Sequence, residues 1–258
     1  MFIDTHIHWN NPQLMKDIPR LIERAFEVEV KTFIVIGYDH QTNVDAISIA
    51  EHYPFVYAAV GYHPTMAHTL TPEDYTLLES YLTHPKVKAV GEFGIDLYWE
   101  KETLDAQILS MQTQIKLAKR YDLPIIIHMR EGTQVTYETL KAHAPLKGVM
   151  HCYSGSAEMA SSFLDLGLHI GLGGPVTFKN AKTPKEVALQ VPLERLLLET
   201  DAPYLAPHPH RGKTNGAHYI PLIAAQIAQL KDLSVESVAK HTTDNAKRLF
   251  NLKEVQDA

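Results

Sequence analysis

The residues best suited to chemistry are histidines and carboxylates that lie at the ends of short apolar segments. These residues are His6, His8, Glu92, His128, His151 and Asp201. Parallel strands of a closed barrel place their C-terminal ends on one face, so residues far apart in sequence would converge there. Imidazoles and carboxylates that meet at one point form a transition-metal site, and this set offers enough ligands for two ions.

The first part of this pattern combines a histidine pair with a glycine-flanked acid. His6 and His8 are one residue apart in an extended segment, so both imidazoles point the same way. Gly91 and Gly94 flank Glu92 and allow unusual backbone angles and close approach of other groups. A carboxylate there can bridge two ions. Taken singly, the histidines could instead face solvent on an edge strand, and Glu92 could be a buried salt-bridge partner.

The second part of the pattern comes later in the chain. His128 and His151 each close an apolar segment, where a lone histidine is more often a satisfied core residue than a ligand. Their recurrence beside a histidine pair and an acid favours ligation. Asp201 could bind one ion and take a proton from the attacking water, or cap the following turn. Asp96 could orient a ligand or cap its own loop.

Short apolar segments alternate with helical stretches along the whole chain. The continuous apolar character of the segments is typical of parallel strands buried on both faces. The predicted strands are residues 2–4, 32–37, 55–60, 87–91, 124–128, 148–151, 168–172 and 195–199. Helical spacing of apolar residues predicts helices over 12–29 and 103–121 and closing helices over 217–250, and residues 205–216 form an exposed loop. The alternation predicts an α/β protein, a single-domain (β/α)8 TIM-type barrel over residues 1–258 with its metal site at the C-terminal face of the strands.

The composition limits the possible classes of protein. A hydrophobic content of 45% supports a large core and excludes a disordered chain. No apolar run approaches the roughly 18 residues of a membrane helix, and no basic segment followed by an apolar one begins the chain, so neither a membrane partner nor a secretory signal is expected. Cys152 is the only cysteine, which rules out an intrachain disulfide and fits a cytoplasmic protein.

The charge balance bears on the substrate. The 24 Lys and Arg residues against 30 Asp and Glu residues give a net charge of −6, which argues against a broad basic nucleic-acid surface. A small phosphate site beside metal ions stays compatible with this balance because the ions supply local positive charge. Several of the 15 histidines are predicted to be ordinary surface or partly buried residues: His84, His143, His169, His218 and His241.

Seven short motifs occur in order along the chain. They are Asp4-Thr5-His6-Ile7-His8, Gly61-Tyr62-His63-Pro64, Gly91-Glu92-Phe93-Gly94-Ile95-Asp96, Ile127-His128-Met129-Arg130, His151-Cys152-Tyr153-Ser154-Gly155, Glu199-Thr200-Asp201-Ala202-Pro203-Tyr204 and Arg211-Gly212-Lys213. Together they resemble the TatD family of metal-dependent deoxyribonucleases, within the amidohydrolase superfamily. The stretch 243–250 is also similar to the C-terminal signature of that family, so the resemblance covers essentially the whole chain.

The resemblance implies a barrel with two divalent ions. By similarity, His6, His8 and Asp201 would hold one ion, His128 and His151 the other, and Glu92 would bridge them, which makes Asp201 and Glu92 the catalytic residues. Histidine ligands favour zinc, manganese, iron or nickel, and the carboxylates also tolerate magnesium.

The resemblance also implies a substrate class. Family members hydrolyse DNA phosphodiesters, often exonucleolytically, and some are linked to removing D-amino acids from mischarged tRNA. The expected partner is therefore a DNA strand end or a small phosphoester, with no obligate protein partner evident. The expected substrate-binding residues are His63, Arg130, Tyr153, Tyr204, Arg211 and Lys213. For His63 and Arg130, a turn histidine before Pro64 and a surface salt bridge are the structural alternatives.

One motif departs from the family pattern. The family commonly continues Arg-Gly-Lys with an acidic residue and a proline, where this chain has Gly216 and Ala217. This departure predicts a more mobile loop and alters its substrate contacts, but it leaves the proposed ligands intact.

Other functions stay open at the level of sequence. The same metal centre could hydrolyse an amide, a lactone or an aminoacyl ester, including D-aminoacyl-tRNA. A non-catalytic, metal-stabilised binding protein is a further alternative, although structural zinc sites are usually rich in cysteine. Aromatic residues close to the motifs could stack a terminal base or belong to the core: Tyr62, Tyr98, Trp99, Tyr153 and Tyr204.

Overall fold

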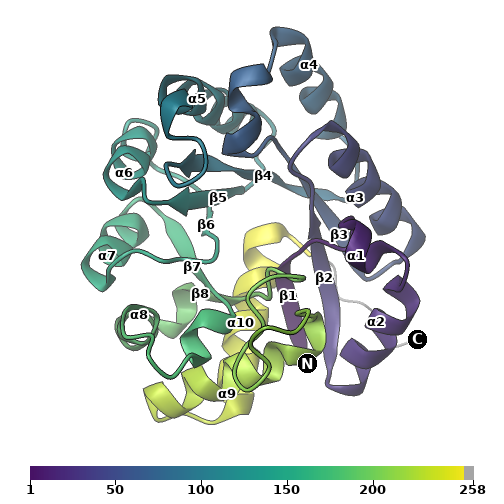
Figure 1. Ribbon diagram of the computed structural model, residues 1–258, viewed down its shortest axis with the longest axis vertical. Coiled ribbons are helices and arrows are strands. Elements are labelled where there is room, and N and C mark those ends of the chain that lie inside the picture. The colour runs from purple at the N-terminus through teal and green to yellow at the C-terminus, as the bar shows by residue number, and fades with distance from the viewer. Residues whose placement is uncertain (253–258) are drawn as a thin grey trace.

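The computed structural model describes residues 1–252, in which eight parallel strands lie in chain order from β1 to β8. Figure 1 shows the strands at the centre of the molecule and the helices around them. The strands are β1 (Phe2–Ile7), β2 (Val30–Ile36), β3 (Val56–Val60), β4 (Val87–Asp96), β5 (Ile125–Arg130), β6 (Gly148–Met150), β7 (Leu168–Leu172) and β8 (Leu196–Leu198). The predicted (β/α)8 barrel is confirmed, and residues 253–258 of the predicted domain lie outside the described part.

Helices fill the connections between the strands. They are α1 (Pro12–Met15), α2 (Ile18–Glu27), α3 (His40–His52), α4 (Pro72–Tyr81), α5 (Leu104–Arg120), α6 (Thr133–Lys141), α7 (Ala157–Asp165), α8 (Thr183–Gln190), α9 (Ile220–Lys231) and α10 (Val235–Phe250). The expectation of one helix over 12–29 was wrong. Pro19 has no backbone N–H to continue a helix from α1, and it instead occupies the first turn of α2.

The seam between β1 and the segment that follows β8 nearly closes the barrel and brings two parts of the site together. Ile7 forms a parallel bridge with Ala202, and the backbone N–H of Asp201 donates to the carbonyl of His6 over 2.9 Å. The buried Asp4 carboxylate reinforces this seam by accepting hydrogen bonds from the N–H and hydroxyl of Thr200 at 3.0 and 2.6 Å. The closure therefore fixes Asp201 beside the histidine pair of β1.

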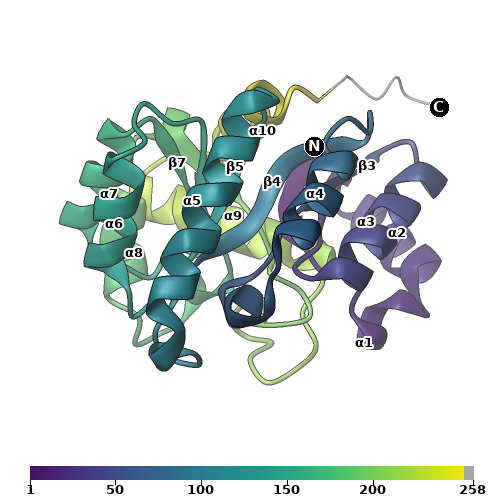
Figure 2. The same cartoon turned by 90° about the horizontal axis from the view of Figure 1, so that it is seen from above.

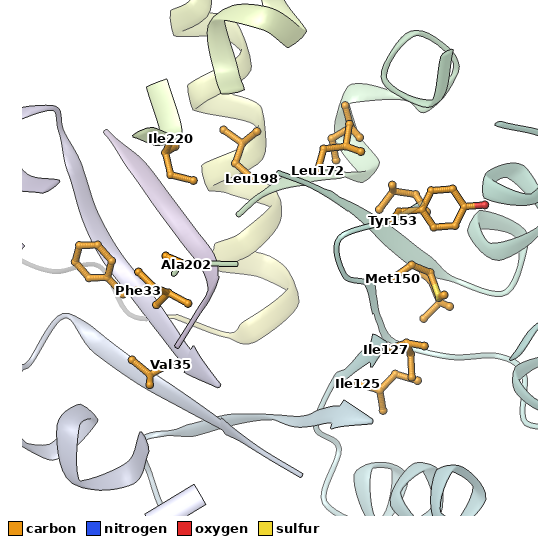
Figure 3. Close-up of a cluster of buried hydrophobic side chains, with 14 of the residues drawn as sticks. Phe33, Val35, Ile125, Ile127, Met150, Tyr153, Leu172, Leu198, Ala202 and Ile220 are labelled. Atoms are coloured by element: carbon orange, nitrogen blue, oxygen red, sulfur yellow. The ribbon is translucent and has the colours of Figure 1, made fainter. Parts of the chain in front are cut away.

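The core has two parts because successive strand residues face opposite sides. Ile34, Ile36 and Ile126 belong to a cluster inside the barrel. Phe33 and Ile125 belong to the larger cluster between strands and helices, part of which Figure 3 shows.

The two ends of the barrel differ in how they are closed. Leu249 and Phe250 of α10 pack into the cluster inside the barrel and plug its N-terminal end. Figure 2 shows α10 at one end of the molecule and the long loop after β8 at the other. The C-terminal ends of the strands are thus the end left open for a site. Within residues 1–252, no helix combines the length and apolar character that crossing a membrane requires.

All five histidines predicted to be ordinary surface or partly buried residues are partly buried. One of them, His169 in β7, should make the free energy of unfolding depend on pH. Burial and the positive charge of Arg195 lower the pKa of His169 from 6.5 to about 4. The unfolded chain therefore binds the proton more readily, and the contribution of neutral His169 to stability is lost as the pH falls from 6.5 towards 4.

Between pH 7 and pH 5, the free energy of unfolding should fall by about 1 kcal/mol less in His169→Gln than in the wild type. Urea unfolding of both proteins at the two pH values measures this difference. His68→Gln, at an exposed position, is the control. An identical pH dependence in wild type and His169→Gln would contradict the assignment.

Candidate metal centre

The barrel brings all six predicted ligands to its open end. His6 and His128 lie near the ends of their strands, and Glu92 lies inside β4, which continues past it to Asp96. His151 follows β6 directly, and Asp201 follows β8 after two residues. The side chains of His6, His8, Glu92 and His151 are buried, and that of Asp201 is only 15% exposed. The ligands therefore converge in a poorly hydrated setting.

The β1 histidines face the two carboxylates. The Nε2 atom of His6 lies 3.0 Å from Oε2 of Glu92 and 3.7 Å from Oδ1 of Asp201. The Nε2 atom of His8 lies 3.3 Å from the same Asp201 oxygen and 3.2 Å from Nε2 of His6. Nδ1 of His8 lies 3.3 Å from the carbonyl of Ile36, so a proton on Nδ1 leaves the Nε2 lone pair free for a metal.

Glu92 lies between two groups of histidines. Its Oε2 atom is 3.2 Å from Nε2 of His151, whose ring stacks on His6 with centroids 3.8 Å apart. Its Oε1 atom is 3.6 Å from Nε2 of His63. His63 also lies against His128, with ring centroids 4.4 Å apart, and the donor atoms of His63, Glu92 and His128 lie within 4.8 Å of one another.

This grouping differs from the expected one in two respects. The structure places His128 with His63 and His151 with His6, and the rings of His128 and His151 are 5.9 Å apart. The pairing of His128 and His151 on one ion stays a prediction. His63, expected to contact substrate, lies close enough to Glu92 to be a further ligand candidate.

The donor set fits a divalent cation on geometric grounds. Donors bound at 2.0–2.1 Å to a tetrahedral ion lie about 3.3 Å apart. His6 lies 3.0 to 3.7 Å from donor atoms of His8, Glu92 and Asp201, and His8 lies 3.3 Å from Asp201. Two ring nitrogens that face each other at 3.2 Å cannot both carry a proton without repulsion. A cation between them would satisfy both lone pairs. Buried histidine and glutamate clusters of this chain can thus bind metal.

Electrostatics around Glu92 also suit a cation. Burial opposes its ionisation, but the imidazoles of His151 and His6 outweigh burial and hold the pKa of Glu92 well below its usual range. Burial opposes protonation of His151 as well, but the carboxylates of Glu92 and Glu199 raise its pKa to about 9. The site is therefore anionic enough to retain a proton, and a metal ion would replace that proton on binding.

Asp201 and His63 have opposite electrostatic settings. Burial favours neutral Asp201, but the hydrogen bond from His8 together with the positive charges of His151, His6 and His8 outweighs it and lowers the pKa of the carboxyl group. Burial, with the nearby His128, lowers the pKa of His63 to about 4. At neutral pH, Asp201 is a carboxylate and His63 a neutral imidazole, so each has a lone pair available.

Gly94 sets the spacing between β4 and β5. It has φ +154° and pairs with His128, and a Cβ atom there would overlap the His128 carbonyl oxygen. We expect Gly94→Ala to lower the free energy of unfolding by about 3 kcal/mol and turnover by about 100-fold, because it displaces a predicted ligand. Chemical unfolding, metal analysis and kinetics measure these effects.

Gly212→Ala is the matched control for this change. Gly212 also has positive φ, at +84°, but no atom beyond its two chain neighbours lies within 4 Å of the added Cβ. This variant should show backbone strain alone, about 1 kcal/mol, and keep its metal. Equal metal loss in both variants would show that the effect of Gly94→Ala is not local to the site.

A cavity of about 770 Å³ opens over the metal centre. The predicted substrate contacts His63, Arg130 and Tyr204 line it. Tyr153 does not: it is buried, and its hydroxyl donates to the carbonyl of Ser156 over 2.9 Å. Among the described residues, Arg211 and Lys213 do not line the cavity either, because they lie farther along the exposed loop. There, the guanidinium carbon of Arg211 lies 4.2 Å from the ring centroid of Phe178.

Two further carboxylates lie behind the histidines. Glu199 was not predicted to support a ligand, and for Asp96 the sequence allowed either an orienting or a capping role. Glu199 is buried, with Oε1 3.5 Å from Nδ1 of His151, and it also accepts a hydrogen bond from the backbone N–H of Cys152. Asp96 Oδ2 lies 3.0 Å from Nε2 of His128. Carboxylates in such positions orient histidine ligands, which supports the orienting role considered for Asp96. In the sequence, the one indication of a role for Glu199 is that a charged residue stands at the end of an apolar strand.

A (β/α)8 barrel with histidines and carboxylates gathered at the C-terminal ends of its strands defines the metal-dependent hydrolases of the amidohydrolase-type fold. The family described as TatD related DNase matches residues 3–251. The chain belongs to this family, which confirms the resemblance of its motifs.

Individual relatives agree with this assignment. The metal-dependent hydrolase YabD of Bacillus subtilis is 45% identical over 254 residues, covering 98% of this chain and 100% of YabD. The crystal structure of the TatD homologue YjjV from Escherichia coli superposes with a TM-score of 0.93 at 34% identity, covering 98% of both chains. A relative from Edwardsiella piscicida, 32% identical over 97% of this chain and 99% of its own length, is named 3'-5' ssDNA/RNA exonuclease TatD.

Proposed function

We propose that this metal-dependent hydrolase cleaves phosphodiester bonds at the end of a DNA strand. The convergence of three imidazoles on two carboxylates at the base of an open cavity carries the proposal. The relative named as a single-stranded DNA and RNA exonuclease supports a nucleic-acid substrate. Two divalent cations held by the carboxylates of Glu92 and Asp201 would also leave excess positive charge, which suits an anionic phosphodiester.

Each residue has a proposed place in the reaction. His6, His8 and Asp201 would hold one ion, His128 and His151 the other, and Glu92 would contact both. When bound, the two ions supply an activated water nucleophile and polarise the phosphoryl oxygen. We further propose that the protein is cytoplasmic. The candidate ions are zinc, manganese, magnesium, iron and nickel.

Asp201 is the proposed proton acceptor. Its carboxylate reaches the cavity and is ionised at neutral pH, so it can take a proton from the attacking water. Its φ of +57° is uncommon for a residue other than glycine, and such backbone geometry often persists at functional sites. As the water oxygen bonds to phosphorus, the bond from phosphorus to the leaving oxygen breaks.

Arg130 and His63 are the proposed phosphate contacts. Arg130 is exposed and lines the cavity, and its planar guanidinium can donate two parallel hydrogen bonds to phosphate oxygens. The neutral ring of His63 can donate one hydrogen bond or ligate. Tyr204, in the loop after β8, also lines the cavity and could contact the strand end.

The test is hydrolysis of 3′-labelled and 5′-labelled single-stranded oligonucleotides, after chelation and after restoring zinc, manganese or magnesium. We expect metal-dependent stepwise shortening from one end, which would also give the polarity and the preferred ion. Aminoacyl esters and a small phosphodiester are assayed in parallel. Hydrolysis of an aminoacyl ester without cleavage of any oligonucleotide would overturn the proposal.

A further inference from the structure

Two aromatic side chains stand exposed at the rim of the metal cavity. Tyr98 and Trp99 follow β4 after Leu97 and are 51% and 64% exposed, with their rings edge to face and 4.7 Å apart. The other tryptophan, Trp9, is 1% exposed and packs against Phe33. Burial of large aromatic side chains is energetically favourable, so an exposed pair at a site suggests that a ligand covers it.

The loop that carries this pair is tied to the metal centre. Oδ1 of Asp96 accepts hydrogen bonds from the backbone N–H groups of both Tyr98 and Trp99 over 2.9 Å. Oδ2 of the same carboxylate lies 3.0 Å from Nε2 of His128. One buried side chain therefore fixes both the aromatic pair and a predicted ligand, so their relative positions are set by hydrogen bonds.

The loop is also closed from its other side. The buried Gln107 side chain accepts a hydrogen bond from the N–H of Asp96 over 2.8 Å and donates to the carbonyl of Glu100 over 2.6 Å. These bonds fasten both ends of the segment that presents the rings. A ligand would thus meet an ordered surface and lose little affinity to ordering it.

Arg130 contacts the aromatic pair and lines the same cavity as the metal centre. Its guanidinium carbon is 3.9 Å from the centroid of the Tyr98 ring and 5.5 Å from that of Trp99. Trp99 and Arg130 line one cavity together with His128 and Glu92. One cavity thus combines an aromatic face, a cation suited to phosphate and the candidate metal centre.

We propose that Trp99, supported by Tyr98, stacks the unpaired base at the end of a nucleic-acid strand while Arg130 binds the adjoining phosphate. This inference rests on the proposed function and names its substrate class as a single-stranded polynucleotide end. Stacking on an aromatic ring accepts any base, because every base has a π face. Tyr204, exposed elsewhere on the same wall, differs in that its hydroxyl accepts a hydrogen bond from Asn11 over 3.2 Å.

The test compares a single-stranded oligonucleotide with the same strand whose terminal base is replaced by hydrogen. In the wild type, removal of the base should raise KM roughly 5- to 100-fold, with a smaller effect on kcat. In Trp99→Ala this ratio of KM values should fall close to one, and Trp99→Phe should restore part of it. Leu189→Ala, which removes a 53% exposed apolar side chain from α8, should keep the wild-type ratio.

A wild-type ratio in Trp99→Ala would overturn the proposal, as would a loss confined to kcat and equal on both strands. If the wild type cleaves neither strand, the proposed function fails, and a fluorescence titration still decides on the stacking site. A nucleoside monophosphate should quench the exposed Trp99, ribose 5-phosphate should not, and Trp99→Phe should lose the response. Equal responses to both compounds would refute stacking.

Discussion

Replacement of Asp201 by asparagine should lower turnover on single-stranded DNA by roughly 10²- to 10⁴-fold while part of the metal stays bound. The amide keeps the shape of the side chain and one oxygen, but it cannot accept the proton of the attacking water. Asparagine also tolerates the left-handed backbone of this position, φ +57°, better than alanine would. Steady-state kinetics at saturating metal, with metal analysis of the same sample, measures the change.

Asp232→Asn is the matched control for this substitution. Asp232 also has a left-handed backbone, φ +54°, but it ends α9 and lies outside the cavity wall. The two variants therefore share the same chemical change and backbone class. Near-wild-type turnover of Asp201→Asn would exclude Asp201 as the proton acceptor. An equal loss in both variants would point to a general effect on folding.

The barrel and the convergence of the site residues could be predicted from sequence because both follow from local patterns. Apolar runs marked the strands. In a parallel barrel, the topology alone places a histidine or carboxylate at the C-terminal end of such a run at one end of the barrel. The boundaries were less accurate at the site itself. β4 runs on through Glu92 to Asp96, and β5 runs through His128 to Arg130. Polar residues there are strand residues because the site supplies partners for them.

Contacts between distant segments could not be predicted in the same way. The approach of Glu199 to His151 depends on the register of β7 and β8, since the Glu199 side chain fits only over Gly171. The position of His63 beside Glu92 depends on the turn that follows β3. Neither contact has a pattern within one element. Tyr153 was misplaced for a similar reason: proximity in sequence to His151 did not reveal that its ring packs outward against Phe163.

Replacement of Glu92 by glutamine should lower the amount of bound metal and reduce turnover by more than about 10³-fold. Glu92 Oε2 faces His6 and His151 at 3.0 and 3.2 Å, and Oε1 faces His63 at 3.6 Å. Glutamine has the same shape, but it removes the negative charge and places an NH2 group where a cation or a protonated imidazole must approach. Because the carboxylate contacts both groups of histidines, affinity should fall for both of the proposed ions. Calorimetric titration of metal into the chelated protein measures both.

Glu199→Gln separates the loss of a shared ligand from the loss of a ligand support. Of the predicted ligands, Glu199 approaches His151 at 3.5 Å from Nδ1, and its carboxylate also lies within 4.8 Å of a ring nitrogen of His6. Its replacement should therefore weaken the proposed ion on His151 most, roughly 10- to 100-fold, and the other ion less. Equal loss of both ions from Glu92→Gln, beside unequal loss from Glu199→Gln, is the pattern that a bridging carboxylate requires. If Glu92→Gln instead bound two ions with wild-type affinity, the centre would have to be built from His6, His8, Asp201 and the remaining histidines alone, without a shared oxygen.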